Sequence, residues 1–141
     1  MGHRIEFELK HRIVLLSFTG VVTDDSLLIG ISDAVKFITA HGTEGIIVDF
    51  SGIESFRVSV ACIRNYVSIR ETFAQDKPRV IVAPQPVVYE MSRTFQVLVE
   101  TSVDVLLVRT LAQAHELLKL ESPVFGAEPW SARPKALGAK N

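Results

Sequence analysis

A serine and an arginine stand together where a predicted helix begins, and both residues could take part in anion chemistry. Ser59 opens the helix, so its hydroxyl can accept a hydrogen bond from the helix backbone as an N-cap. The same hydroxyl could carry phosphate, because free backbone N–H groups and the positive helix end stabilise added negative charge. Arg57 could pair with such an anion or be a solvated loop residue. We predict an N-cap at Ser59 and keep phosphorylation as the alternative.

Polar and aromatic residues also follow the other predicted strands. In open α/β sheets, ligands bind outside the carboxyl ends of the strands, which here are the segments 51–59, 84–86 and 109–110. We expect these segments to be loops that line one rim, or else to carry solvated charges. Tyr89 and Arg93, four residues apart on a predicted helix, could form a polar pair on one face. The candidate ligand rim comprises Pro84, Pro86, Tyr89, Arg93 and Arg109.

The sequence shows no group of residues that is typical of a catalytic site. A nucleophile elbow, a phosphate-binding loop and a dinucleotide fingerprint are all missing. The four histidines have no spacing that presents two metal ligands on one face. The single Cys62 has no second thiol for a disulfide or a metal pair, so we expect it to pack in the core. We predict a protein that is not an enzyme, with no catalytic residue, metal or cofactor.

Alternating strand and helix patterns position these residues. Alternation of apolar and polar residues predicts an N-terminal hairpin. The short, β-branched runs at 45–50 and 79–83 predict strands buried on both faces of a mainly parallel sheet. This order predicts an α/β fold, an open mixed sheet of about five strands with four helices. The strands are expected at 5–9, 13–18, 45–50, 79–83 and 103–108, and the helices after N-cap candidates at 23–26, from about 59, from 86, and over 111–120.

Length, composition and charge restrict the class of protein. A chain of 141 residues fits one domain, and 48% hydrophobic residues can fill its core. A net charge of -1, with charges of both signs mixed along the chain, lacks the basic surface that nucleic acid requires. No apolar run reaches the roughly 20 residues of a membrane helix. We therefore predict a cytoplasmic protein without nucleic acid or a membrane span.

The composition changes after residue 122. Residues 123–141 are rich in Pro, Gly and Ala and lack periodicity, which predicts an extended or disordered C-terminal tail beyond a domain at 1–122. Phe125 and Trp130 are the large apolar residues of this tail. They dock loosely on their own domain, stay mobile, or anchor a partner.

The segment after the third predicted strand resembles the signature of STAS domains, the SpoIIAA-like family of anti-sigma-factor antagonists. Residues 49–53, DFSGI, match the family's Asp-Leu-Ser-Gly-Val. The family continues with an acidic residue and a phosphorylated serine that opens the next helix. Here Arg57 replaces the acidic residue, Val58 the phosphorylated serine and Val60 a following glycine, whereas Ser59 aligns with the second hydroxyl position. The resemblance implies a SpoIIAA-like fold in the branch that lacks the phosphorylatable serine.

Two other segments carry the same resemblance. SFTGVVTD at 17–24 is similar to the end of the family's second strand, and AQAHELLKL at 112–120 is similar to its closing helix. The segment at 82–100 resembles the SpoIIAA-like branch that is grouped by fold with lipid-transfer CRAL-TRIO proteins. The resemblance thus covers roughly residues 3–120.

Two functions of different classes remain open. The first is a non-enzymatic regulatory or scaffold module that binds a protein partner without a phosphoserine switch. The alternative is a binding protein for a small anionic or lipid-like ligand in the crevice at the strand ends, by analogy with lipid-transfer domains. A low net charge and an apolar surface also leave a homodimer open. The predicted surface for a protein partner comprises Asp49, Ser51, Arg57, Ser59 and Arg64.

Overall fold

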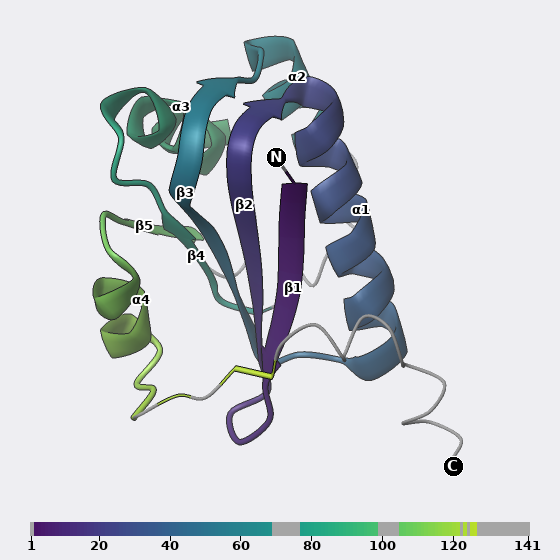
Figure 1. Cartoon of the computed structure of the whole chain (residues 1–141), viewed down its shortest axis with the longest axis vertical. Helices are drawn as coiled ribbons and strands as arrows, with labels where there is room; N and C mark the ends of the chain where they lie inside the picture. Colours follow the sequence, from purple (N-terminus) through teal and green to yellow (C-terminus); the bar gives the residue numbers. More distant parts are fainter. Residues whose placement is uncertain (1, 69–76, 99–104, 122, 124, 127–141) are drawn as a thin grey trace.

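The elements of the fold follow the order that the sequence predicts. The computed structural model describes residues 2–68, 77–98, 105–121, 123, 125 and 126. Within these residues the predicted α/β fold of five strands and four helices is confirmed (Figure 1). The elements are β1 (Gly2–Glu8), β2 (Ile13–Thr23), α1 (Asp24–His41), β3 (Gly45–Arg57), α2 (Val60–Ser68), β4 (Arg79–Val82), α3 (Pro86–Leu98), β5 (Val105–Val108) and α4 (Leu111–Leu117).

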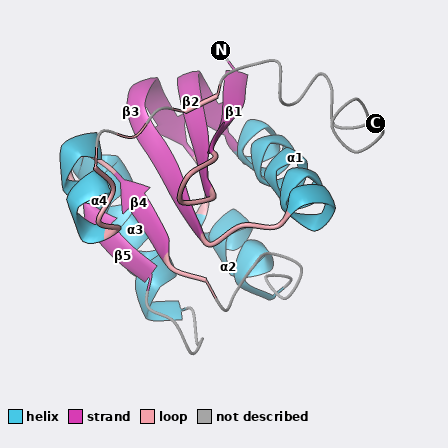
Figure 2. Ribbon diagram, turned by 90° about the horizontal axis from the view of Figure 1, so that it is seen from below, coloured by secondary structure: helices cyan, strands magenta, loops and turns pink. Residues whose placement is uncertain are grey.

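The sheet is mixed, with strands in the order β1-β2-β3-β4-β5. The hairpin strands β1 and β2 are antiparallel, and each later strand pairs in parallel with the one before it. Helices α1, α2 and α3 share a large core with one face of the sheet, whereas α4 covers a smaller core on the other face. Figure 2 shows α1 and α4 on opposite sides of the sheet. The two cores explain why the central strands are apolar on both faces.

Strand β3 is more than twice as long as the strand predicted at 45–50, because it continues beside β2 after its last pair with β4 at Asp49. Its pairing with β2 runs to the register Thr23↔Arg57, so the prediction of a loop at 51–57 is wrong. Two register shifts place one extra residue each in β3. The inward residues are therefore Phe50, Ile53 and Phe56, at steps of three. Such spacing hides a strand from a search for a two-residue period.

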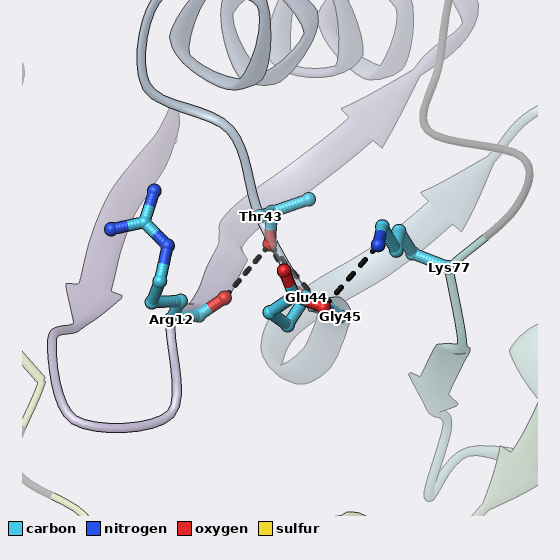
Figure 3. A network of polar contacts seen from close by, with 5 residues as sticks. All are labelled: Arg12, Thr43, Glu44, Gly45 and Lys77. Carbon is cyan, nitrogen blue, oxygen red and sulfur yellow. Dashed lines mark hydrogen bonds and ion pairs between the residues drawn. The ribbon is translucent and has the colours of Figure 1, made fainter.

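At the end of the sheet where β3 begins, a polar network joins the α1–β3 connection to the β1–β2 hairpin (Figure 3). The buried hydroxyl of Thr43 lies 2.7 Å from the carbonyl oxygen of Gly45 and 3.1 Å from that of Arg12. The backbone N–H of Glu44 also donates to the carbonyl of Arg12, at 2.8 Å. The Glu44 carboxylate in turn lies 3.3 Å from Nζ of Lys77, just before β4. These contacts fix where β3 starts beside β2 and β4.

Both outer edges of the sheet are partly occupied. Gly126 exchanges two backbone hydrogen bonds with Phe7 on β1, at 3.1 and 2.7 Å. Phe125 packs on the core beneath α4 with its ring 6.1 Å from that of His115, so these tail residues dock on their own domain. At the other edge, the Gln96 amide donates to the carbonyl of Val105 on β5, at 2.6 Å. Trp130 lies outside the described residues.

Other element ends also differ from the prediction. Leu9 does not continue the alternation of β1, because it lies in the turn after the strand and is 67% exposed. Helix α4 ends at Leu117 rather than at Leu120. The first two residues of the predicted last strand, Val103 and Asp104, lie outside the described residues.

The close approach of α1 to β2 at Gly30 gives a first testable prediction. A Cβ on Gly30 would lie 2.6 Å from two ring atoms of Phe18, which is buried and stacked on Phe50. Gly30→Ala should therefore destabilise the protein by about 1–2 kcal/mol, although alanine is the better helix former. Urea unfolding measures the difference. Ser32→Ala, at an exposed position of the same helix, is the control and should change stability by less than about 0.5 kcal/mol. Equal stability of Gly30→Ala and wild type would contradict the packing argument.

Candidate functional site

The paired ends of β2 and β3 bring the first turns of α1 and α2 together (Figure 1). Thr23 ends β2 and caps α1, with Ser26 completing a capping box. Asp24, the first residue of α1, accepts two hydrogen bonds from Ser59. The backbone N–H of Ser59 donates to Oδ1 at 2.7 Å, and its hydroxyl donates to Oδ2 at 2.8 Å. One carboxylate thus joins the starts of both helices.

Ser59 is also the N-cap of α2, as predicted. Its Oγ accepts a hydrogen bond from the backbone N–H of Cys62, at 3.0 Å, three residues into the helix. The hydroxyl therefore donates to Asp24 and accepts from Cys62 at the same time. A phosphate on this oxygen would break the donated bond and place negative charge beside the carboxylate of Asp24.

Electrostatics at this junction favour a charged Asp24. The backbone and hydroxyl hydrogen bonds from Ser59 hold the pKa of Asp24 below its ordinary value. Burial raises the pKa of the Cys62 thiol, and the nearby charge of Asp24 adds to this effect. Cys62 is 5% exposed and packs in the large core. Its environment therefore favours the neutral thiol, which suits packing better than nucleophilic chemistry.

Val58, in the position where the STAS signature has its phosphorylated serine, points into the protein. Its side chain is 8% exposed and belongs to the core that α1, α2 and α3 share with the sheet. The next residues, Ser59 and Val60, are exposed, as are Arg57 before them and Arg64 one turn into the helix. Val60 is a large apolar side chain with 44% exposure.

The predicted protein-binding residues do not lie on a single surface. Ile47 packs in the core beneath α4, whereas Phe50 packs in the core on the α1 side. Because side chains alternate along a strand, Asp49 belongs with Ile47 on the α4 side of the sheet. Asp49 accepts hydrogen bonds from the backbone N–H of Ser51, at 3.0 Å, and from the Ser51 hydroxyl. Asp49 and Ser51 therefore form a local turn-like pair away from Ser59.

The predicted ligand rim is only partly assembled. The guanidinium of Arg109 lies over the ring of Tyr89, 3.9 Å from its centroid, in a cation–π contact. Tyr89 and Arg109 line an open groove of about 360 Å³ between α3 and α4, together with Gln113 and Glu116. Pro84, Pro86 and Arg93 are exposed but are not part of the groove's lining. Tyr89 thus has Arg109, from the end of β5, as its cationic neighbour.

A second, apolar cavity lies between the sheet and helices α1, α2 and α3. Its volume is about 70 Å³. Natural cores hold few voids larger than a water molecule, so a space of this size is unusual in a small core. Two polar residues, both buried, are among its lining: Arg79 at the start of β4 and Ser92 on α3. No local sequence pattern signals this cavity, because its walls come from six separate elements.

Two histidines pair with acidic side chains. His3 Nε2 lies 2.7 Å from Asp33, and His11 lies 3.1 Å from the carboxylate of Glu8. Burial lowers the pKa of His41, and the charge of Arg12 lowers it further. Among the described residues, no three His, Cys, Asp or Glu side chains are grouped so that they could hold a metal ion. No helix within the described ranges is long and apolar enough to cross a membrane.

Two solved structures share this architecture. The unphosphorylated form of the anti-sigma factor antagonist SpoIIAA superimposes with a TM-score of 0.56 at 15% identity, over 84% of this chain and 98% of SpoIIAA. The chain has the SpoIIAA-like fold. An uncharacterised DUF3478-family protein from Shewanella loihica PV-4 with a SpoIIAA-like fold gives a TM-score of 0.55 at 10% identity, over 83% of this chain and 92% of that one. No family model matches the sequence, and no curated protein matches it.

In this SpoIIAA-like fold, the residue that sequence analysis missed is Asp24. Its role depends on Ser59, 35 positions away, and only the parallel pairing of β2 with β3 brings the two together. A signal for it does exist. An acidic residue in the first turn of a helix is favoured by the helix dipole, and Asp24 directly follows the capping Thr23.

The hydrogen bonds to Asp24 predict a pH-dependent contribution to stability. Because its folded-state pKa is depressed, the contribution is complete above the unfolded-state pKa of about 3.9 and is lost as the pH falls through the lower folded value. Wild type should therefore be more stable than Asp24→Asn at neutral pH, by a margin that is constant above about pH 5 and shrinks below about pH 4. Urea unfolding at a series of pH values measures the margin.

Asp25→Asn is the matched control for this experiment. Asp25 lies in the same first turn, but both hydrogen bonds from Ser59 go to Asp24. A margin for Asp24→Asn that does not shrink in acid, or that equals the margin for Asp25→Asn at every pH, would contradict the assignment.

Proposed function

We propose that this SpoIIAA-like domain is a non-enzymatic regulatory module that binds a protein partner constitutively. Its binding surface is formed where α1 and α2 begin. We call this the helix-end surface, and it comprises Asp24, Arg57, Ser59, Val60 and Arg64. The SpoIIAA comparison supports a binding module of this general type, since that protein is an anti-sigma factor antagonist.

The observation that carries the proposal is the state of the two residues at the phosphorylation position. Val58 is buried and has no hydroxyl. Ser59 uses its hydroxyl in two hydrogen bonds, one of them to a carboxylate. A kinase would have to break the Asp24 contact and then place a phosphate against it. Binding that needs no modification is therefore the form of regulation that this junction supports.

The chemistry of the helix-end surface suits a protein partner. Val60 is an exposed apolar side chain of this surface, and arginines precede and follow it along the chain. Protein interfaces commonly have an apolar centre, an enrichment in arginine and a polar rim. The fixed carboxylate of Asp24 adds a negative charge, so a complementary partner presents both an apolar group and charges of mixed sign. Asp49 and Ser51 are left out, because they belong to the other face of the sheet.

Charge reversal on the helix-end surface tests this proposal. Immobilised wild-type protein is incubated with extract of the source cells, and captured proteins are quantified by mass spectrometry. The double variant Arg57→Asp, Arg64→Asp should capture at least tenfold less of the specific partner, because like charges across an interface are strongly unfavourable. Arg93→Asp, at an exposed arginine on α3, is the matched control and should capture the partner as wild type does.

Two results would contradict the proposal. One is that the double variant captures as much of the partner as Arg93→Asp and wild type do. The other is loss through Arg93→Asp alone, which would move the interface to α3. Circular dichroism of each variant checks that the comparison is made between folded proteins.

The constitutive character is tested by phosphorylation. After incubation of the protein with the same extract and ATP, peptide mapping should find no phosphate on Ser59. Ser59→Ala should lose about 1 kcal/mol of stability with its N-cap, yet should still capture the partner. A phosphorylated Ser59, or capture that changes with ATP treatment, would show that the module is switched.

A further inference from the structure

The apolar cavity beneath the helices has the features of a binding site for hydrocarbon. Its walls are built by α1, α2 and α3 on one side and by β3, β4 and β5 on the other. Most of the lining side chains are aliphatic or aromatic. They are Leu27, Ile31, Val48, Phe50, Phe56, Ile63, Ile81, Met91, Phe95 and Val105.

Water is a poor occupant of this cavity. A buried water needs two to four polar partners, and apolar cavities without them stay dry. Among the described residues of the lining, Arg79 and Ser92 are the polar ones, and both are buried in the wall. An apolar group, in contrast, would regain the van der Waals contacts that the surrounding side chains lack.

The size of the cavity limits what it can hold. One water-sized sphere needs about 10–15 Å³ of such volume, so 70 Å³ provides about five to seven positions of that size. A complete drug-sized ligand needs about 300–1,000 Å³. The cavity therefore matches a chain of about six carbon atoms rather than a whole lipid.

We infer that this cavity binds the hydrocarbon end of a small amphipathic molecule, with the polar end of that molecule outside. The site is distinct from the helix-end surface and does not rest on the proposed partner binding. It also differs from the sequence-predicted crevice at the strand ends, because none of Pro84, Pro86, Tyr89, Arg93 and Arg109 lines it.

Methyl NMR with 1-hexanol as the probe tests the site. Isoleucine methyl groups are labelled, and the alcohol is titrated into the full-length protein. Saturable shifts are expected at Ile31, Ile63 and Ile81, which line the cavity. Ile13 and Ile47, in the core beneath α4, are internal controls and should not follow the same curve.

A cavity-filling variant provides the second arm. Ser92→Leu adds apolar volume at the wall, so it should weaken 1-hexanol binding at least tenfold and raise the unfolding temperature without the probe. Val97→Leu, at a position on the same helix that is 80% exposed, should change neither quantity. If Ser92→Leu does not fold, Val48→Ile fills the same cavity from β3 and decides the outcome.

The inference is overturned by shifts that do not saturate or that are equal at all isoleucines. It is also overturned if a folded filling variant binds 1-hexanol as tightly as wild type. A cavity-filling variant that loses hexanol binding should still capture the partner, and the double variant Arg57→Asp, Arg64→Asp should still bind hexanol. These two results separate the cavity from the helix-end surface.

Discussion

The parallel pairing of β2 with β3 as far as Arg57 is the constraint on which the rest of the structure depends. These strands have 11 and 13 residues, whereas β4 and β5 have four each. Because α1 follows β2 directly and α2 follows β3 after two residues, the paired strand ends bring two helix N-termini together. Each helix end carries a partial positive charge, so the two ends repel. Asp24 lies in the first turn of α1 and accepts two hydrogen bonds from Ser59, the N-cap of α2, so its charge stabilises both ends.

Sequence patterns were sufficient for the fold but not for the length of this pairing. The apolar runs at β3 and β4 and the helical repeats are local signals, and they predicted the order of the elements. The extension of β3 gave no such signal, because two bulges change the inward spacing from two residues to three at Phe50, Ile53 and Phe56. Bulges depend on the neighbouring strand, so a single segment of sequence cannot show them.

The same distinction applies to the candidate site. The N-cap of Ser59 is local and was predicted, whereas its bonds to Asp24 span 35 residues and were not. Asp49 and Ser59 were grouped because they are near in sequence, but strand alternation assigns Asp49 to the α4 side. Tyr89 was paired with Arg93 on one helix, yet its ring lies beneath Arg109 from the end of β5. Contacts between elements thus decided the side-chain partners.

The edges of the sheet limit how this protein can meet others. Unpaired edge strands are the usual route to association by strand addition. Here Gly126 forms two backbone hydrogen bonds with Phe7 on β1. On the short β5, Gln96 takes the carbonyl of Val105, and Gln113 accepts from the backbone N–H of Arg109 just beyond the strand. Within the described residues, these contacts occupy Phe7 on one edge and Val105 on the other. The proposed helix-end surface therefore does not depend on strand addition, since it offers exposed Val60 and two exposed arginines at the start of a helix.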